Sequence, residues 1–242
     1  MANQSSNDLP LFYKQPKVLD RVQDANKKLA MPGNFTFAAQ ANAVPIVIDE
    51  FAIAAASYPI VFLQTAEPVP AVVLGVTPQR NLYVGPNGEW LNNAYLPAYV
   101  RRYPFILVDD PQSKQMLLCY DETSGMVTEG GDLPLFDNGQ PSMVTNNALN
   151  LCLALRQQGE TTENFVRALR QRGLLNDQSI EIKTPAGDSH VVNGFLTLDE
   201  QKFAALPDDV YIQWRKLGWI KLIYAHLQSQ VLWQRLGEMV SD

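Results

Sequence analysis

The sequence has few cysteines, few histidines and no long apolar run. Its two cysteines, Cys119 and Cys152, allow one bridge at most, which excludes a disulfide framework and fits a cytosolic setting. The longest apolar runs, such as Ile53 to Ala56 and Phe105 to Val108, fall far short of the roughly 20 residues that span a bilayer. The first eight residues are polar and lack the basic and apolar regions of a secretory signal. We therefore expect a soluble, cytoplasmic protein that does not insert into a membrane.

Positive charge is also scarce. The chain has 19 Lys and Arg against 25 Asp and Glu, which gives a formal net charge of -6 at pH 7. Nucleic acids and anionic membrane surfaces are normally bound by a basic face, because Lys and Arg neutralise phosphates. The composition therefore disfavours broad binding to either, although a local basic patch stays open. With 46% hydrophobic and 18% charged residues, the chain is typical of a folded globule.

The common metal, cofactor and catalytic motifs are missing. There is no Cys-x-x-Cys or His-x-x-x-His pair for zinc. Gly130-Gly131 lacks the Lys-Ser or Lys-Thr of a phosphate loop, and no Gly-x-Gly-x-x-Gly opens a helix. A Ser-His-Asp triad stays open, because its members meet only in space, but no Gly-x-Ser-x-Gly elbow favours it. We predict no metal site and no cofactor.

Of three pairs of adjacent acidic residues, two are candidates for cation binding. Asp109-Asp110 and Asp121-Glu122 lie at predicted strand ends and could offer oxygen ligands to a hard cation. We favour solvated turn carboxylates for both pairs. Asp208-Asp209 are better explained as the start of a helix, where the macrodipole favours negative charge.

Prolines and glycines divide the chain into an arm and a body. Residues 1–34 are polar and contain three prolines, and Leu11 to Tyr13 could anchor them, so we predict an N-terminal extension packed on the body. Residues 35–242 are predicted to form a single domain. This domain is β-rich over residues 58–122 and contains helices and one hairpin over residues 142–242.

The predicted fold class is α+β. Short strands with short connections favour antiparallel pairing, because parallel pairing needs a crossover of a dozen or more residues. We expect an antiparallel β-meander and an additional hairpin, packed by a short N-terminal helix and by C-terminal helices. The expected strands cover residues 60–63, 71–76, 81–84, 105–108 and 115–120. The hairpin covers 180–192 with its turn at Pro185 to Asp188, and a long loop is expected over 125–141. The expected helices cover residues 49–57, 145–156 and 161–172, the last capped by Thr161 or Thr162 and ended by Gly173. From Asp199 onward the pattern is helical, with a break at Gly218 before a final helix over about 219–239.

The most informative segment places two adjacent arginines between aromatic residues, directly before an apolar strand. In an extended strand neighbours point to opposite faces, so Arg101 and Arg102 should not act together. One could stack on an aromatic ring, and the other could pair with an acid or hold a carboxylate or phosphate through two N–H groups. The segment is either the ordered lead-in to a core strand or a site for a small anionic ligand. The candidate ligand-binding residues here are Trp90, Tyr99, Arg101, Arg102 and Tyr103.

The C-terminal segment has two interpretations. His226 lies in an apolar helix and is predicted to be a packed structural histidine, with a catalytic or ligand-binding role as the alternative. The segment also carries more apolar residues than one solvent-facing helix normally does. It is either buried on most sides or forms an exposed strip for self-association or a protein partner. The residues concerned are Trp214, Leu217, Trp219, Ile220, Leu222, Ile223, Leu227, Val231, Trp233 and Leu236.

Segments along nearly the whole chain resemble the bacterial SapC family. They include Pro10-Leu-Phe-Tyr13, Tyr58-Pro-Ile-Val-Phe62, Leu74-Gly75, Asn81-Leu82, Gly88-Glu-Trp90, Tyr95-Leu-Pro-Ala-Tyr-Val-Arg-Arg-Tyr-Pro-Phe105, Leu135-Phe136, Gly194-Phe195, Asp199-Glu200 and Ile223-Tyr-Ala-His-Leu-Gln-Ser229. This family is distinct from the similarly named membrane permease of a peptide transporter. Its name implies an association with bacterial surface layers, and the gene neighbours of its members imply nutrient uptake or peptide modification.

The resemblance supplies no catalytic residues. We therefore predict a SapC-like accessory or binding protein and lean against an enzyme, because the sequence is poor in catalytic candidates. The alternative is an enzyme that acts on a peptide or a small carboxylic acid, which an arginine would orient.

Overall fold

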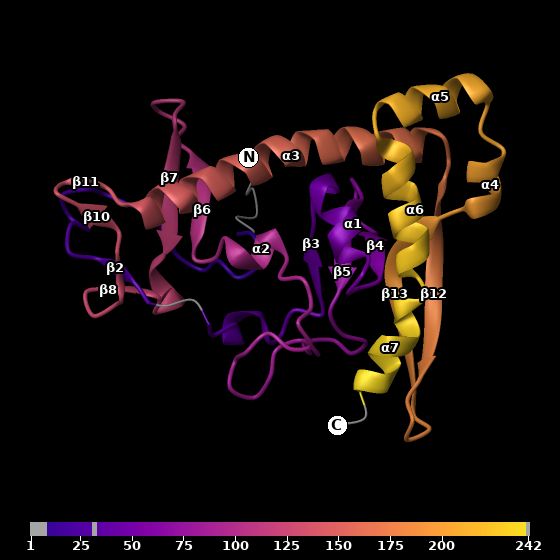
Figure 1. Cartoon of the computed structure of the whole chain (residues 1–242), viewed down its shortest axis with the longest axis horizontal. Coiled ribbons are helices and arrows are strands. Elements are labelled where there is room, and N and C mark those ends of the chain that lie inside the picture. Colours follow the sequence, from indigo (N-terminus) through magenta and orange to yellow (C-terminus); the bar gives the residue numbers. More distant parts are fainter. Residues whose placement is uncertain (1–8, 31–32, 241–242) are drawn as a thin grey trace, which may run out of the picture. The chain divides into compact units, whose positions relative to one another are not determined.

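The computed structural model describes residues 9–30 and 33–240 (Figure 1). Contacts along the backbone separate the chain into two compact units. Unit 1 comprises residues 1–33 and 102–154, and unit 2 comprises residues 34–101 and 155–242. The predicted division into an extension over 1–34 and one domain over 35–242 stays a prediction, and residues 1–8 of that extension lie outside the described part.

Unit 2 is built on a five-stranded antiparallel sheet. Its strands, in spatial order, are β12 (Leu175–Lys183), β13 (Ser189–Leu198), β4 (Ile60–Leu63), β5 (Val69–Val73) and β3 (Ala43–Pro45). The β12–β13 pair is the predicted hairpin, and its turn is closed by a hydrogen bond from the amide of Thr184 to the carbonyl of Asp188, at 2.8 Å. The antiparallel α+β class is therefore confirmed. The predicted strand over 81–84 is reduced to one bridge between Val84 and Trp90.

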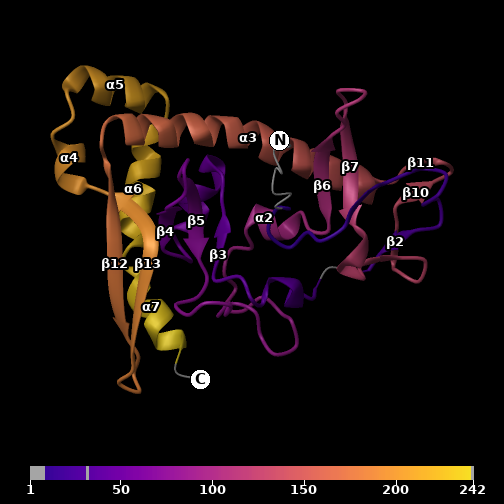
Figure 2. The ribbon, with the colours of Figure 1, turned by 180° about the vertical axis from the view of Figure 1, so that it is seen from behind.

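Helices cover this sheet and extend beyond it (Figures 1 and 2). The helices of unit 2 are η1 (Thr36–Ala38), η2 (Ile48–Glu50), α1 (Phe51–Ala54), α2 (Ala98–Arg101), α4 (Glu200–Ala204), α5 (Asp208–Lys216), α6 (Trp219–Ser229) and α7 (Leu232–Met239). Gly218 has a φ of 76° before α6, which confirms the predicted break. The prediction of one final helix over 219–239 was wrong, because Gln230 interrupts it. The Gln230 side chain donates to the carbonyls of Ile60 (2.8 Å) and His226 (3.0 Å), which ties this turn to β4.

Helix α3 (Met143–Gln171) belongs to both units, residues 143–154 to unit 1 and 155–171 to unit 2. Two helices had been predicted here, with Thr161 or Thr162 as the cap of the second, and this was wrong. Both hydroxyls instead donate to carbonyls one turn earlier in the same helix, Thr162 to Gln158 at 2.7 Å. Threonine in this arrangement sits inside a helix and does not begin one. The helix ends where predicted, before Gly173.

The core of unit 2 joins the sheet to α1, α3 and α6. The rings of Phe51 and Phe165 meet edge to face with centroids 6.0 Å apart, and Phe165 in turn contacts Trp219. Most of the apolar C-terminal residues are buried, including Ile223 and Leu236 at 0% exposure. Burial on most sides therefore accounts for the apolar character of this segment. Self-association through it stays a prediction.

Unit 1 contains small antiparallel sheets. One has the order β1 (Pro16–Val18), β7 (Met116–Asp121) and β6 (Phe105–Asp109); the second has the order β8 (Val127–Thr128), β2 (Lys28–Leu29) and β9 (Leu133–Pro134); the third pairs β10 (Phe136–Asp137) with β11 (Gln140–Pro141). A continuous loop over 125–141 had been predicted. The segment instead forms short strands, because β8 and β9 both pair with β2 of the N-terminal arm and Leu135 is fully buried.

Two buried carboxylates hold the described part of the arm on this unit. Asp121 accepts hydrogen bonds from the amides of Lys14 (2.8 Å) and Gln15 (3.2 Å). Asp24 accepts from the hydroxyl of Tyr120 at 3.2 Å. Both carboxylates are at most 1% exposed, so their hydrogen bonds replace lost contacts with water. Asp121 is thus a structural group and not the solvated turn carboxylate that had been predicted.

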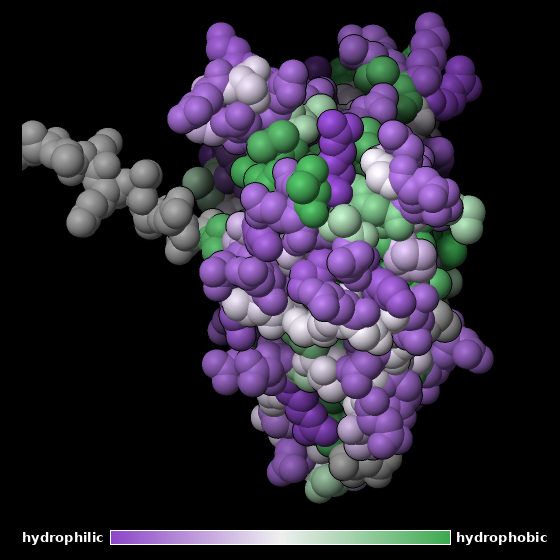
Figure 3. Space-filling model, turned by 90° about the vertical axis from the view of Figure 1, so that its left-hand side faces the viewer, coloured by the Kyte–Doolittle hydropathy of each residue, from purple (hydrophilic) through white to green (hydrophobic). Residues whose placement is uncertain are grey.

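The surface is mainly hydrophilic on the face shown in Figure 3, with hydrophobic side chains gathered in its upper part. Single exposed apolar residues, such as Val22 and Met143 at 77% exposure, are normal on a folded protein. No helix in the described residues combines the length and apolar character needed to cross a membrane. Both cysteines are buried and free.

Candidate functional site

The two adjacent arginines lie at the end of a short helix. The extended conformation predicted for them was wrong, because α2 ends at Arg101 and strand β6 begins only at Phe105. The amides of Val100 and Arg101 both donate to the carbonyl of Pro97, which starts the helical turn. Arg101 is the last residue of this stretch of unit 2, and Arg102 is the first of the next stretch of unit 1.

A buried glutamate from η2 anchors this segment. Glu50 is 4% exposed, and its Oε1 accepts hydrogen bonds from the amide of Ala98 (2.8 Å) and the hydroxyl of Tyr95 (3.0 Å). Its Oε2 accepts from the amide of Val47 at 3.0 Å. Arg101 donates to the Tyr95 hydroxyl at 3.1 Å and lies 5.8 Å from the centre of that ring. Arg101 therefore forms the outer layer of a network centred on Glu50.

The next two candidates are part of unit 1. The guanidinium of Arg102 lies 5.6 Å from the centre of the Tyr13 ring. The hydroxyl of Tyr103 donates to Asp121 at 3.4 Å, and burial together with this carboxylate raises the pKa of Tyr103 to about 12. Tyr99 lies in α2 of unit 2 and is half-buried. The ligand-binding role of these residues stays a prediction.

Trp90 belongs to an aromatic cluster in unit 2. Its indole N–H donates to the hydroxyl of Tyr58 at 3.0 Å, and its ring stacks on Tyr83 with centroids 6.3 Å apart. The Tyr83 hydroxyl donates to the carbonyl of Ser57 at 3.0 Å, and the Tyr58 hydroxyl donates to the carbonyl of Tyr95. These contacts fix the loop over residues 80–93 against the body of the unit.

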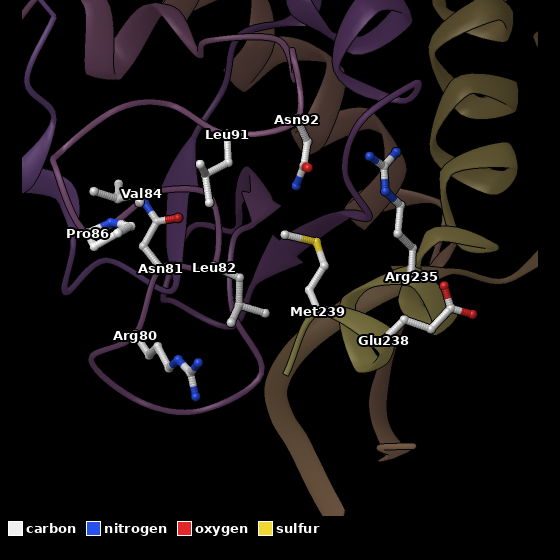
Figure 4. Close-up of a pocket in the computed structure, with 11 residues that line it drawn as sticks. Arg80, Asn81, Leu82, Val84, Pro86, Leu91, Asn92, Arg235, Glu238 and Met239 are labelled. Carbon is white, nitrogen blue, oxygen red and sulfur yellow. The ribbon is translucent and has the colours of Figure 1, made fainter. Parts of the chain in front are cut away.

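A cavity of about 570 Å³ lies between this loop and α7 (Figure 4). Its polar lining residues are Arg80, Asn81, Asn92, Arg235 and Glu238. Its apolar lining residues are Leu82, Val84, Pro86, Leu91 and Met239. The Met239 side chain extends from α7 towards the loop, and Arg235 lies one turn earlier on the same helix (Figure 4). We call this cavity the Arg80–Arg235 pocket.

Backbone conformation and hydrogen bonds within unit 2 fix the loop side of the pocket. A Cβ on Gly75 would lie 1.9 Å from the carbonyl oxygen of Arg80, so only glycine permits the close turn that positions Arg80. Asn81 is 5% exposed, donates to the carbonyl of Ala38 (3.0 Å) and accepts from the amide of Tyr83 (2.9 Å). Asn92 has a φ of 63°, a left-handed conformation that asparagine tolerates. The wall is therefore held in place without a ligand.

The pocket is locally basic. Among the residues that the structure describes, neither Arg80 nor Arg235 forms an ion pair with an acidic side chain. Two guanidinium groups and the one carboxylate of Glu238 leave one net positive charge, in a chain whose formal charge is -6. Burial raises the pKa of Tyr83 to about 12, and the nearby charge of Arg235 acts in the opposite direction. Such a pocket attracts anions.

His226 lies away from this pocket, in the core between α6 and the sheet. It is 1% exposed, and its Nε2 accepts a hydrogen bond from the amide of Leu198 in β13 at 3.1 Å. Its ring lies 5.2 Å from that of Phe62 in β4. Burial lowers the pKa of His226 to about 4. These contacts link helix α6 to two strands, and the ligand-binding role of His226 stays a prediction.

Sequence reasoning missed Arg80 and Arg235. They are 155 positions apart (235 − 80), and neither belongs to a motif with a known ligand. The available signals were weak: Arg80 ends the turn-prone segment Thr77-Pro78-Gln79-Arg80, and Arg235 is a single cation in an apolar helical segment. Only the tertiary structure brings the two side chains to one cavity.

Comparison with known proteins identifies a family over most of the chain. The model of a family described as SapC matches residues 19–236. This range includes Arg80 and Arg235 and ends just before Glu238 and Met239. No curated protein and no solved structure matches the chain.

Proposed function

The chain belongs to the SapC family, and we propose that it is a non-catalytic binding or accessory protein for a small anionic ligand. The ligand class is a molecule with a carboxylate and an apolar body, held in the Arg80–Arg235 pocket. The observation that carries this proposal is that two arginines, neither of which pairs with an acid among the described residues, line one preformed cavity. A carboxylate-bearing peptide fragment would suit the peptide-modification or nutrient-uptake systems that the family resemblance implies.

The two arginines point to a ligand because neither forms an ion pair among the described residues. Arg235 is half-buried, and a partly desolvated charge without a partner lowers the stability of the folded state. Proteins keep such groups where function requires them. A guanidinium matches a carboxylate through two parallel N–H donors, and the pairing is stronger when water is partly excluded.

The remaining lining sets the size and polarity of the ligand. Its apolar side chains suit a hydrocarbon body, and Met239 can adapt its shape because methionine is unbranched and flexible. The volume of about 570 Å³ falls within the range of roughly 300–1,000 Å³ that is usual for small-molecule sites. A short peptide or an acylated amino acid therefore fits the space.

The lining supports binding over catalysis. The described residues that form the pocket include no His, Cys, Ser, Thr, Lys or Tyr. Glu238 is the one lining residue able to act as a general base, and no nucleophile stands beside it. The alternative, an enzyme acting on a peptide or small carboxylic acid, would share the recognition step and would be revealed by turnover of the ligand.

The first experiment compares two probes that differ only in charge. N-acetyl-leucyl-leucine and its C-terminal amide are titrated into the protein and followed by calorimetry. The free acid should bind at least about tenfold more tightly, because hydrogen bonds to a charged partner contribute about 1.5–3 kcal/mol. Equal affinities for acid and amide, or hydrolysis of either probe, would contradict the proposal.

Arg235→Gln should weaken binding of the free acid by about tenfold or more. The same variant should melt within about 2 °C of the wild type or higher, since no ion pair is lost. Arg215→Gln is the matched control, because Arg215 is exposed on α5 and does not line the pocket. That control should keep wild-type affinity.

A further inference from the structure

Unit 2 contains a second cavity with the opposite charge. It has a volume of about 380 Å³ and lies where α4, α5 and α6 meet. Its lining includes the rings of Phe203, Tyr211 and Tyr224 and the carboxylates of Glu200 and Asp208. Helices α4 and α5 lie beside the first part of α6, whereas α7 follows its end (Figure 1). No described residue lines both this cavity and the Arg80–Arg235 pocket. The two cavities are therefore separate sites.

Three aromatic rings, one from each helix, form the walls. Phe203 is 5% exposed, and its ring centre lies 5.8 Å from that of Tyr224 and 6.2 Å from that of Tyr211. Tyr224 is 47% exposed, so part of its ring stays open to solvent. A hydrogen bond with Tyr211 raises the pKa of Tyr224, and the Glu200 carboxylate acts in the same direction. Glu200 also lines the same cavity as these rings.

Two of the residues that line this cavity are acidic. Glu200 and Asp208 are the first residues of α4 and α5, and within the described part of the chain neither forms an ion pair. The helix dipoles explain why acids occur at these positions. They do not explain why three rings and two carboxylates surround one cavity that no Lys, Arg or His lines.

We propose that this cavity binds an alkylammonium group, carried by a lysine side chain of a peptide or by a free amine. The ring faces attract a cation within about 6 Å, by about 0.5–2 kcal/mol depending on its hydration. The carboxylates accept hydrogen bonds from the ammonium. The half-buried side chains of Leu206 and Leu227 offer contact to the aliphatic stem. The site is independent of the anionic ligand proposed above.

Amide NMR titrations with three probes test this site. Nα-acetyl-lysine N-methylamide should shift the resonances of residues 199–212 and 220–228, whereas the norleucine analogue, which lacks the ammonium, should bind at least about tenfold more weakly. Butylammonium chloride distinguishes a lysine side chain from a free amine as the source of the ammonium group. Tighter binding of the lysine probe indicates a peptide side chain, and equal binding indicates a free amine. Equal shifts from the lysine and norleucine probes, or no shift from either cation, would overturn the proposal.

The chain offers matched variants for the same measurement. The double variant Glu200→Gln and Asp208→Asn should lose about tenfold or more in affinity for the lysine probe. Asp209→Asn is the control, because Asp209 is the exposed neighbour of Asp208 but does not line the cavity. Tyr224→Phe should keep more affinity than Tyr224→Leu, since it retains a ring face. Unchanged affinity in both the double variant and Tyr224→Leu would rule out the assigned site.

Discussion

Glu50→Ala should lower the free energy of unfolding by about 3–5 kcal/mol, because it leaves buried donors without an acceptor. The amides of Val47 and Ala98 and the hydroxyl of Tyr95 all donate to this carboxylate. An unpaired buried donor costs about 1–3 kcal/mol. Urea unfolding at neutral pH measures the change.

The residue beside Glu50 provides the control. Asp49 is exposed in the same short helix, so Asp49→Ala should change the free energy of unfolding by only about 0.5 kcal/mol. Glu50→Gln should give an intermediate loss, since its amide keeps one acceptor oxygen. If Glu50→Ala and Asp49→Ala destabilise the protein equally, the Glu50 network does not anchor the segment before Arg101.

Acid should destabilise the protein through His226. Its pKa is about 4 in the folded state because of burial, and an unfolded histidine has a pKa of about 6.5. Above pH 6.5 both states are neutral at this residue. As the pH falls towards 4, the unfolded chain gains a proton that the folded state excludes. Between about pH 7 and about pH 4.5 this proton should lower the free energy of unfolding by about 2.5 kcal/mol.

A conservative variant isolates the contribution of His226 from that of the carboxylates. His226→Gln keeps a hydrogen-bond acceptor for the amide of Leu198 and does not titrate. Its free energy of unfolding should therefore fall by about 2.5 kcal/mol less than that of the wild type over the same pH range. His190→Gln, in the β12–β13 hairpin, should keep the wild-type loss. The same acid sensitivity in His226→Gln as in the wild type would contradict the assignment.

Local chemistry made part of the fold predictable. Pro185 to Asp188 correctly indicated a hairpin turn, and Gly173 and Gly218 correctly marked helix ends. Such signals work because the preferences of proline and glycine act within a few residues. Short connections also predicted antiparallel pairing correctly.

The wrong predictions of secondary structure and the missed pocket residues depend on contacts between residues that are distant in sequence, or on local signals that have more than one structural outcome. The segment before Arg101 is helical because its Ala98 amide bonds to Glu50, 48 positions earlier. Thr162 resembles a helix cap, yet its hydroxyl donates within the continuing α3. Arg80 and Arg235 share a cavity only because α7 packs beside the loop over residues 80–93. No local sequence pattern predicts that these two residues line the same cavity.

The Arg80–Arg235 pocket also separates two roles that the sequence alone assigned to one pair of arginines. Arg101 already has a partner in Tyr95, whereas Arg235 faces an open cavity. The first arrangement stabilises a helix end, and the second is the one that we propose for ligand binding.

The assignment of the ligand to this pocket is tested most directly by one calorimetric titration of N-acetyl-leucyl-leucine into three proteins. We expect the wild type and Arg101→Gln to bind the probe with similar affinity, and Arg235→Gln to bind it at least about tenfold more weakly. The opposite pattern, with binding lost in Arg101→Gln and kept in Arg235→Gln, would place the ligand at the paired arginines and contradict the pocket assignment.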